Sequence, residues 1–254
     1  MVTYLILLVG WPLLLVVQSA FDTGLGDMRA LLEDPQIVHA LRLTVVVALI
    51  SVAINTVFGI TMSILLVRYQ FPGKRMLNAF LDLPLAVSPV VVGLSLVLVY
   101  NGRSGWFGPT LEDSGIEVMF ATPAIVMATV FVSLPLVIRE VVPVLQEVGI
   151  EQEQAARSLG ANAVQRFRRI TLPAIKWALI YGMVLALARS LGEFGAVKVV
   201  SGNVLGITRT ATLVVEEKYL NFDQGGAYAT AFLLAMVSVA CIVIVTIIRP
   251  KEQG

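Results

Sequence analysis

The sequence contains very few of the residues that most often carry catalysis, crosslinking or metal binding. It has one cysteine, Cys241, and one histidine, His39, in 254 residues. A single cysteine cannot form an internal disulfide, and a histidine without a second His or Cys nearby builds no metal site. The phosphate-binding pattern Gly-x-x-x-x-Gly-Lys-Ser/Thr is absent from the sequence. We therefore expect a non-catalytic chain that binds no metal or cofactor and holds no ATP itself.

Charge is also scarce and nearly balanced. The chain has 18 Lys and Arg against 17 Asp and Glu, and only 14% of its residues are charged. A net charge of +1 creates no basic field that would attract nucleic acid. In contrast, 57% of the residues are hydrophobic and the mean hydropathy is +0.87. Such a chain has too few polar side chains to cover a water-soluble surface, so the composition indicates a protein embedded in the lipid bilayer.

Six apolar runs are long enough to cross a bilayer, which requires about 20 helical residues. The first run lacks a preceding basic residue and a convincing small-residue cleavage site, so a retained span is favoured over a secretory signal. Prolines inside the third and fourth runs, Pro84, Pro89 and Pro135, predict kinked helices. We predict an all-α membrane protein with a single transmembrane domain over residues 1–254 and about six helices, at 4–21, 43–67, 79–100, 120–142, 173–200 and 226–248.

The distribution of Lys and Arg predicts the orientation of these spans. Segments 68–78 and 139–176 and the tail after residue 248 hold most of the Lys and Arg residues, whereas the other loops hold most of the acids. Lys and Arg collect in cytoplasmic loops, so both termini are predicted to be cytoplasmic. The short external loops leave no room for a folded receptor domain. Capture of a substrate would therefore require another protein.

The stretch between the fourth and fifth spans, residues 146–173, is more patterned than a plain connector. We expect a short helix near 150–159 that ends at Gly160, because glycine adopts the left-handed turn after a helix. A second helix would begin at Asn162, a good N-cap, and end as Pro173 opens the fifth span. Two helices that meet at a glycine on the membrane surface would form a protruding knob.

Two readings of this knob remain open from the residue pattern. Ala155 and Ala156 allow another backbone to approach closely, and Leu159 and Phe167 offer apolar anchors for a protein partner. The alternative is an amphipathic surface helix whose cationic side chains contact anionic lipid, namely Arg166, Arg168 and Arg169.

The same residues carry a resemblance to a known family. The EAA loop of binding-protein-dependent ABC importer permeases has the consensus Glu-Ala-Ala, three residues, Gly, nine residues, Ile, one residue, Leu-Pro. The family's glutamate is Gln154 here, a neutral amide that can hydrogen-bond but lacks charge-assisted strength. The other positions match, at Ala155, Ala156, Gly160, Ile170, Leu172 and Pro173.

This resemblance implies a fold, a function and a set of partners. It implies the type I permease fold, with a cytoplasmic loop of coupling helices that sit in a cleft of a separate ATPase subunit. Two such ATPase subunits would bind ATP and Mg. Segments 81–94, 131–145 and 188–203 look like sulfate and thiosulfate permeases, most of all the W-type subunit. That subunit would work in a prokaryotic cell membrane with a T-type permease and an extracytoplasmic sulfate-binding protein. The alternative is a molybdate or tungstate permease, which would form a homodimer.

Ionisable residues within the spans are the candidates for the translocation path. Arg189 and Glu193 lie four positions apart in the fifth run, so one helix face would carry both. Ionisable groups in a span usually face the bundle interior or a wet path. We therefore expect the pair to line the path, with a purely structural ion pair as the alternative. Asp82, which also suits an interfacial or capping role, and Ser88, beside the Pro89 kink, are further candidates.

Small side chains recur every four residues along the fifth run. Such a stripe permits close helix approach in lipid, and we predict that it packs against a second permease subunit. The stripe consists of Ala174, Ala178, Gly182, Ala186 and Ser190.

Other transport classes fit less well, because the sequence shows no internal repeat typical of a secondary transporter and no glycine-rich filter typical of a channel.

Overall fold

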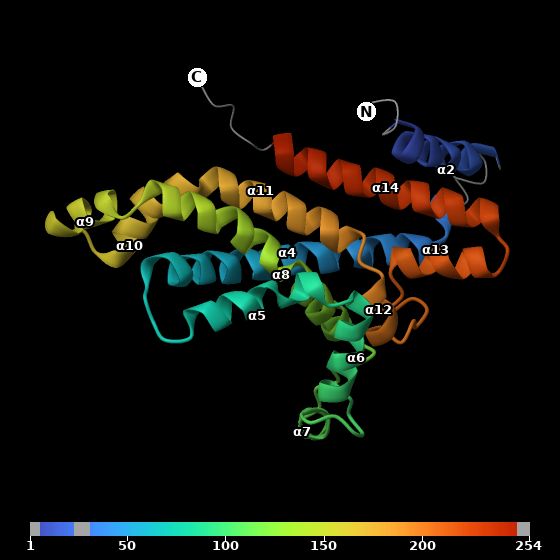
Figure 1. Ribbon diagram of the computed structural model, residues 1–254. Coiled ribbons are helices and arrows are strands. Elements are labelled where there is room, and N and C mark those ends of the chain that lie inside the picture. The colour runs from blue at the N-terminus through green and yellow to red at the C-terminus, as the bar shows by residue number, and fades with distance from the viewer. Residues whose placement is uncertain (1–5, 23–30, 248–254) are drawn as a thin grey trace.

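The protein is a bundle of long helices with two projections. The structure, a computed structural model, describes residues 6–22 and 31–247. In Figure 1, α9 and α10 lie at one end of the bundle, here termed the α9 end, and α6 and α7 project from its side. The helices are η1 (Ile6–Gly10), α2 (Trp11–Asp22), α4 (Pro35–Arg68), α5 (Lys74–Ala86), α6 (Pro89–Tyr100), α7 (Gly108–Asp113), α8 (Thr122–Val148), α9 (Glu151–Ser158), α10 (Ala163–Arg166), η2 (Phe167–Thr171), α11 (Leu172–Leu191), α12 (Gly195–Val200), α13 (Ala211–Leu220) and α14 (Gln224–Ile247).

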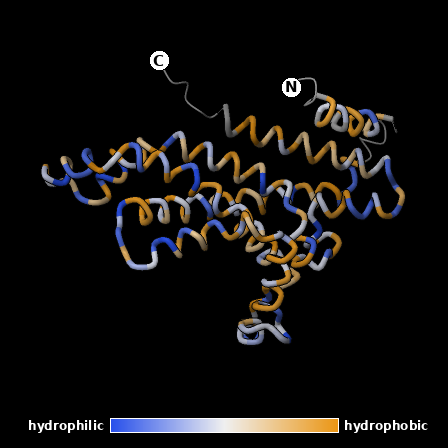
Figure 2. Tube along the Cα trace, in the orientation of Figure 1, coloured by the Kyte–Doolittle hydropathy of each residue, from blue (hydrophilic) through white to orange (hydrophobic). Residues whose placement is uncertain are grey.

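The described helices agree with a protein that crosses the membrane several times. Within the described residues, four helical runs are long and apolar enough to span a bilayer, namely α4, α8, Ala163–Leu191 and Gln224–Ile244. The pair α5 and α6 adds a fifth candidate. The predicted run 4–21 lies partly outside the described residues, and its described portion is helical. Figure 2 shows hydrophobic residues along the long helices and hydrophilic ones at the α9 end and in the loops. The expected all-α fold of about six helices is therefore confirmed.

The third predicted span is two helices rather than one. α5 ends at Ala86 and α6 begins at Pro89, and the two axes differ by 112°. Ser88 has ψ 135°, as expected for a residue that precedes proline and is excluded from the helical region. Pro89 also lacks the N–H that would continue the helix. The predicted kink is therefore a sharp elbow, and it turns α6 out of the bundle (Figure 1).

The fifth predicted span, 173–200, is also interrupted. α11 ends at Leu191, and α12 starts at Gly195 after a short non-helical turn. The Glu193 carboxylate lies in this turn, where its Oε1 accepts a hydrogen bond from the Ala196 backbone N–H at 3.0 Å. That bond satisfies one of the free amides at the start of α12. The expectation of one continuous helix that carries both Arg189 and Glu193 was therefore wrong.

The core lies where α4, α8 and α11 pack together. The small-residue stripe of α11 faces α8 of the same chain, because a Cβ added at Gly182 would lie 3.0 Å from the Val137 Cα atom. Ala186 and Ser190 are buried there as well. For these three positions the prediction that the stripe packs against a second subunit was therefore wrong, since close approach within the chain already covers them. Ala174 and Ala178 remain partly exposed. The largest core cluster is formed by Ala48, Val52, Val137, Val141, Leu145, Ile175, Leu179, Ala186, Leu187 and Leu191.

Buried polar side chains connect the three core helices. Asn55 of α4 is fully buried and donates from Nδ2 to the Val130 carbonyl at 3.1 Å and to Ser133 Oγ at 2.8 Å. Ser133 donates to the Thr129 carbonyl, and Ser190 of α11 reaches Ser133 at 3.3 Å. Such hydrogen bonds between membrane helices contribute about 0.6 kcal/mol each on average. Their main effect is to set the register of α4, α8 and α11.

Candidate functional site

The segment 146–173 forms two short helices, as its local signals predict. α9 ends one residue before Leu159, and Gly160 adopts a φ of 86°. Nothing lies within 4 Å of a Cβ placed at Gly160, so the left-handed backbone rather than lack of space favours glycine there. Asn162 caps α10 through its side chain at 2.8 Å from the Gln165 amide, and the Gln165 side chain returns the bond at 2.9 Å. The predicted turn and cap are both confirmed.

The end of the second helix differs from the expectation. α10 passes through the π-helical turn η2 directly into α11, so Pro173 marks no break. Proline is tolerated in the first turn of α11 because an N–H is dispensable there. The segment is therefore a rigid extension of α11 that carries Phe167, Ile170 and Leu172, with α9 folded back beside it.

The segment from α9 to α10 presents exposed apolar and small residues at the tip of the molecule. The Leu159 side chain is 89% exposed and that of Val164 is 65% exposed. Gln154 and Ala155 are exposed, and Ala156 is partly buried. Figure 1 places α9 and α10 beyond the ends of the long helices. An exposed leucine beside alanines that permit close approach is typical of a protein-binding surface.

Glu153 fastens α9 to the bundle, which the sequence pattern did not predict. Its Oε1 accepts hydrogen bonds from Arg68 Nε at 3.2 Å and Nη2 at 3.0 Å, and from Thr171 Oγ1 at 3.1 Å. Arg68 ends α4, is 10% exposed and also donates to the Leu145 carbonyl of α8 at 3.1 Å. One carboxylate thus connects α9 with the ends of α4 and η2, and Arg68 in turn connects it with α8.

The sequence positions of Glu153 and Arg68 are recognisable, but they do not by themselves predict this contact. Glu153 directly precedes Gln154, the position at which the EAA consensus has its acid, and Arg68 closes the second predicted span. Only the fold brings these two residues together, since 85 positions separate them. The segment therefore keeps a charged anchor although Gln154 itself is neutral and exposed.

At the opposite end of the bundle, Arg189 and Glu193 form the expected ion pair. Arg189 Nη1 lies 2.6 Å from Glu193 Oε2. The Glu193 side chain is 1% exposed, whereas that of Arg189 is 38% exposed. The Glu193 carbonyl accepts a hydrogen bond from Thr212 Oγ1 of α13 at 3.1 Å. The buried acid therefore holds the α11–α12 turn together, while the arginine keeps part of its surface open.

The other two path candidates lie along α5 and its elbow. Asp82 is two turns inside α5, and its Oδ1 accepts a hydrogen bond from Arg139 Nε of α8 at 3.0 Å. Asp82 therefore forms an ion pair with α8 and does not cap a helix. Ser88 is exposed at the elbow, next to Pro89, whose Cβ lies 3.2 Å from a Cβ placed at Gly195. The elbow thus adjoins the turn that holds Glu193.

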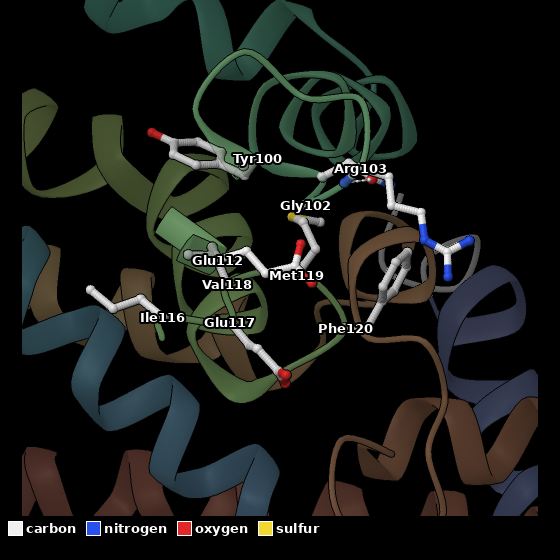
Figure 3. A pocket seen from close by; sticks show the side chains of 11 residues that line it. Tyr100, Gly102, Arg103, Glu112, Ile116, Glu117, Val118, Met119 and Phe120 are labelled. Carbon is white, nitrogen blue, oxygen red and sulfur yellow. Dashed lines mark hydrogen bonds between the residues drawn. The ribbon is translucent and has the colours of Figure 1, made fainter. Parts of the chain in front are cut away.

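A separate hollow lies where α6 and α7 project. Its wall carries two carboxylates, Glu112 and Glu117, and one guanidinium, Arg103. In Figure 3 the Arg103 side chain points away from both carboxylates. An excess of acidic groups disfavours an anion. This hollow is therefore unsuited to anions, unlike the surface around Arg189.

Comparison with known proteins agrees with this architecture. Residues 55–253 match the family described as "Binding-protein-dependent transport system inner membrane component". The match covers most of the chain, which therefore belongs to that family of importer permeases.

Individual relatives indicate which importer permeases this chain resembles. The "Sulfate transport system permease protein CysW" of Synechococcus elongatus is 46% identical over 248 residues, which cover 98% of this chain and 86% of that protein. CysW of Escherichia coli (strain K12) is 44% identical, with 94% and 81% covered. "Sulfate transport system permease protein CysT" of Salmonella typhimurium is 37% identical, with 89% and 82% covered.

A solved structure shares the fold. A chain from the "Crystal structure of a bacterial ABC transporter involved in the import of the acidic polysaccharide alginate" superposes with a TM-score of 0.81. The superposition covers 97% of this chain and 91% of that one, at 16% sequence identity. At that identity the likeness shows the importer permease fold alone.

Proposed function

We propose that this chain is the W-type membrane subunit of an ATP-driven importer for sulfate. The observation that carries the proposal is identity of 44–46% to sulfate permeases along nearly the whole chain. The path candidates are compatible with this substrate. Arg189 offers a half-exposed guanidinium whose charge Glu193 partly offsets. An arginine in that setting attracts a doubly charged oxyanion without binding it too tightly to be released.

The ATP hydrolysis that drives transport would take place on a separate subunit. The exposed surface of α9 around Leu159 would sit in a cleft of a separate ATPase subunit that binds ATP and Mg, with two such subunits per transporter. The α9 end would then face the cytoplasm, in agreement with the Lys and Arg residues gathered there. The Glu153 anchor supports this role, because it would transmit movement of α9 to the ends of α4, α8 and α11.

The complete transporter would contain two unequal permeases. This chain resembles both CysW and CysT proteins, with the higher identity to CysW. A T-type permease is therefore the proposed partner, and an extracytoplasmic sulfate-binding protein would deliver the substrate. Thiosulfate, which has the same charge and a similar tetrahedral shape, would follow the same route.

Reconstitution tests the proposal directly. The chain would be co-expressed with a T-type permease and the ATPase subunit, placed in proteoliposomes and supplied with sulfate-binding protein. We expect ATP hydrolysis that sulfate stimulates, uptake of radiolabelled sulfate, and crosslinking of an Ala156→Cys variant to the ATPase subunit. The chain alone should hydrolyse no ATP. A functional homodimer stimulated by molybdate but not by sulfate would instead establish the molybdate permease as the correct reading.

A further inference from the structure

A further arginine–carboxylate pair joins α5 and α8, nearer the α9 end than Arg189 and Glu193. Arg139 of α8 and Asp82 of α5 are joined at 3.0 Å, yet their side chains are 56% and 40% exposed. The predicted fourth span, 120–142, ends three residues after Arg139, whereas α8 continues for nine residues beyond it to Val148. At 1.5 Å per residue, Arg139 lies about 14 Å from that helix end. The pair is therefore inside a membrane-spanning helix and still open on one side.

Exposed charged side chains this far inside a membrane-spanning helix require water or polar groups around them. Ionisable side chains in membrane helices are costly in lipid and nearly always face a water-filled cavity, another polar group or the bundle interior. Beside this pair lies a cavity of ≈ 240 Å³ between α5 and α8, with Asn78 as a further polar group on its wall. The remaining wall is mainly apolar and includes Pro135 and Pro143. Few polar groups on an otherwise apolar wall are typical of a small-ligand site.

The pair leaves hydrogen-bond donors available. Among the described residues, Arg139 donates from Nε to Asp82 Oδ1, whereas a guanidinium has five N–H donors in total. Its two Nη groups can therefore present parallel donors to an oxyanion, the geometry that makes arginine suited to such ligands. Asp82 lowers the net charge of the pair, and this limits how tightly an anion would be held.

The depth of this pair relative to Arg189 follows from the packing of α8 on α11. Gly182 of α11 lies level with Val137 of α8, because a Cβ at Gly182 would be 3.0 Å from the Val137 Cα atom. Arg139 is two residues from Val137 towards the α9 end, and Arg189 is seven residues from Gly182 in the opposite direction. The backbone levels of the two arginines therefore differ by about 14 Å along the helices.

We propose that Arg139 and Asp82 form a second anion-binding station on the translocation path, one step closer to the α9 end than Arg189 and Glu193. Its ligand is the doubly charged tetrahedral oxyanion that the transporter carries. The inference rests on the proposed function, and it adds a residue, Arg139, that contacts the transported anion. A lipid phosphate and a contact with the second permease are the competing occupants of the same exposed guanidinium.

Charge rescue by chemical modification tests the station in the assembled importer. The background is Cys241→Ala, which removes the only cysteine of this chain. In that background Arg139→Cys should lower the rate of sulfate uptake at least about tenfold, since a hydrogen bond to a charged group is lost. An aminoethyl methanethiosulfonate reagent, which adds a positive charge, should restore uptake several-fold. The sulfonatoethyl reagent, which adds a negative charge, should not. Sulfate should slow both modifications.

Arg75→Cys provides the matched control, since Arg75 is an exposed cation near the start of α5, the helix that also carries Asp82. Neither reagent should change uptake by that variant. A second variant, Asp82→Asn, leaves Arg139 in place. It should lower both the half-saturating sulfate concentration and the maximal rate of uptake, because the anion is held more tightly.

Several outcomes would overturn the station while leaving the proposed function intact. They are normal uptake by Arg139→Cys, lack of access for either reagent in the assembled complex, and modification that sulfate does not slow. Recovery of uptake in the double variant Arg139→Leu with Asp82→Leu would identify a structural ion pair instead. Failure of the complex with the unchanged chain to transport sulfate would count against the proposed function.

Discussion

Replacement of Glu153 by alanine should uncouple ATP hydrolysis from transport. The change removes the acceptor of three hydrogen bonds, two from Arg68 and one from Thr171. It also deprives Arg68, whose side chain is only 10% exposed, of its counter-charge. The Leu145 carbonyl remains as a partner of Arg68, so the guanidinium is not fully orphaned. The affected contact is the one that fastens α9 to the ends of α4 and η2.

The size of the effect can be worked out from these contacts. A hydrogen bond to a charged group contributes about 1.5 to 3 kcal/mol. The Glu153 side chain is 23% exposed, so solvent weakens the pair and the three bonds do not add fully. We take about 2 kcal/mol for the anchor as a whole, which shifts the equilibrium between attached and detached α9 by about 30-fold. Glu153→Gln, which keeps an acceptor but loses the charge, should fall between alanine and wild type.

The assay compares sulfate uptake with ATP hydrolysis in the reconstituted complex. Glu153→Ala should retain basal hydrolysis while the amount of sulfate moved per ATP falls several-fold. Glu151→Ala is the matched control, because Glu151 is an exposed glutamate in the same helical turn. Removal of both charges, in Arg68→Met with Glu153→Leu, should be milder for stability than removal of Glu153 alone. Equal behaviour of the Glu153→Ala and Glu151→Ala variants would refute the anchor.

Three further predictions concern the turn after α9, the Arg189 pair and the start of α14. Gly160→Val should abolish transport yet reach the membrane, because a side chain at a φ of 86° costs about 1 to 2 kcal/mol and misaligns α9; normal uptake would contradict this. If Arg189 and Glu193 line the path, the double alanine variant should recover expression but not sulfate uptake, whereas full recovery of uptake indicates a structural pair. The pKa of Asp223 lies below its usual 3.8, chiefly because Lys218 donates a hydrogen bond to it. Its stabilising effect is therefore present above pH 3.8 and lost as the pH falls through the lowered pKa. Thermal unfolding of Asp223→Asn should differ from wild type above that range and converge below it.

Features that depend on neighbouring residues could be derived from the sequence. Composition alone placed the chain in a membrane, because apolar side chains have no other favourable solvent in such numbers. Gly160 and Asn162 defined the turn and the cap within segment 146–173, since both act within a few residues of their own position. The spacing of Arg189 and Glu193 likewise predicted their contact, although not the helix break between them.

Features that depend on how helices meet were decided only by the tertiary structure. The stripe around Gly182 was expected to meet a second subunit, but α8 of the same chain covers it. The periodicity of one helix specifies which residues share a face and leaves open which neighbour that face contacts. The Glu153 anchor and the Arg139–Asp82 pair have the same origin, since each joins residues from distant parts of the chain. Long-range ion pairs form where packing brings helix ends and faces together, and no local signal encodes that geometry.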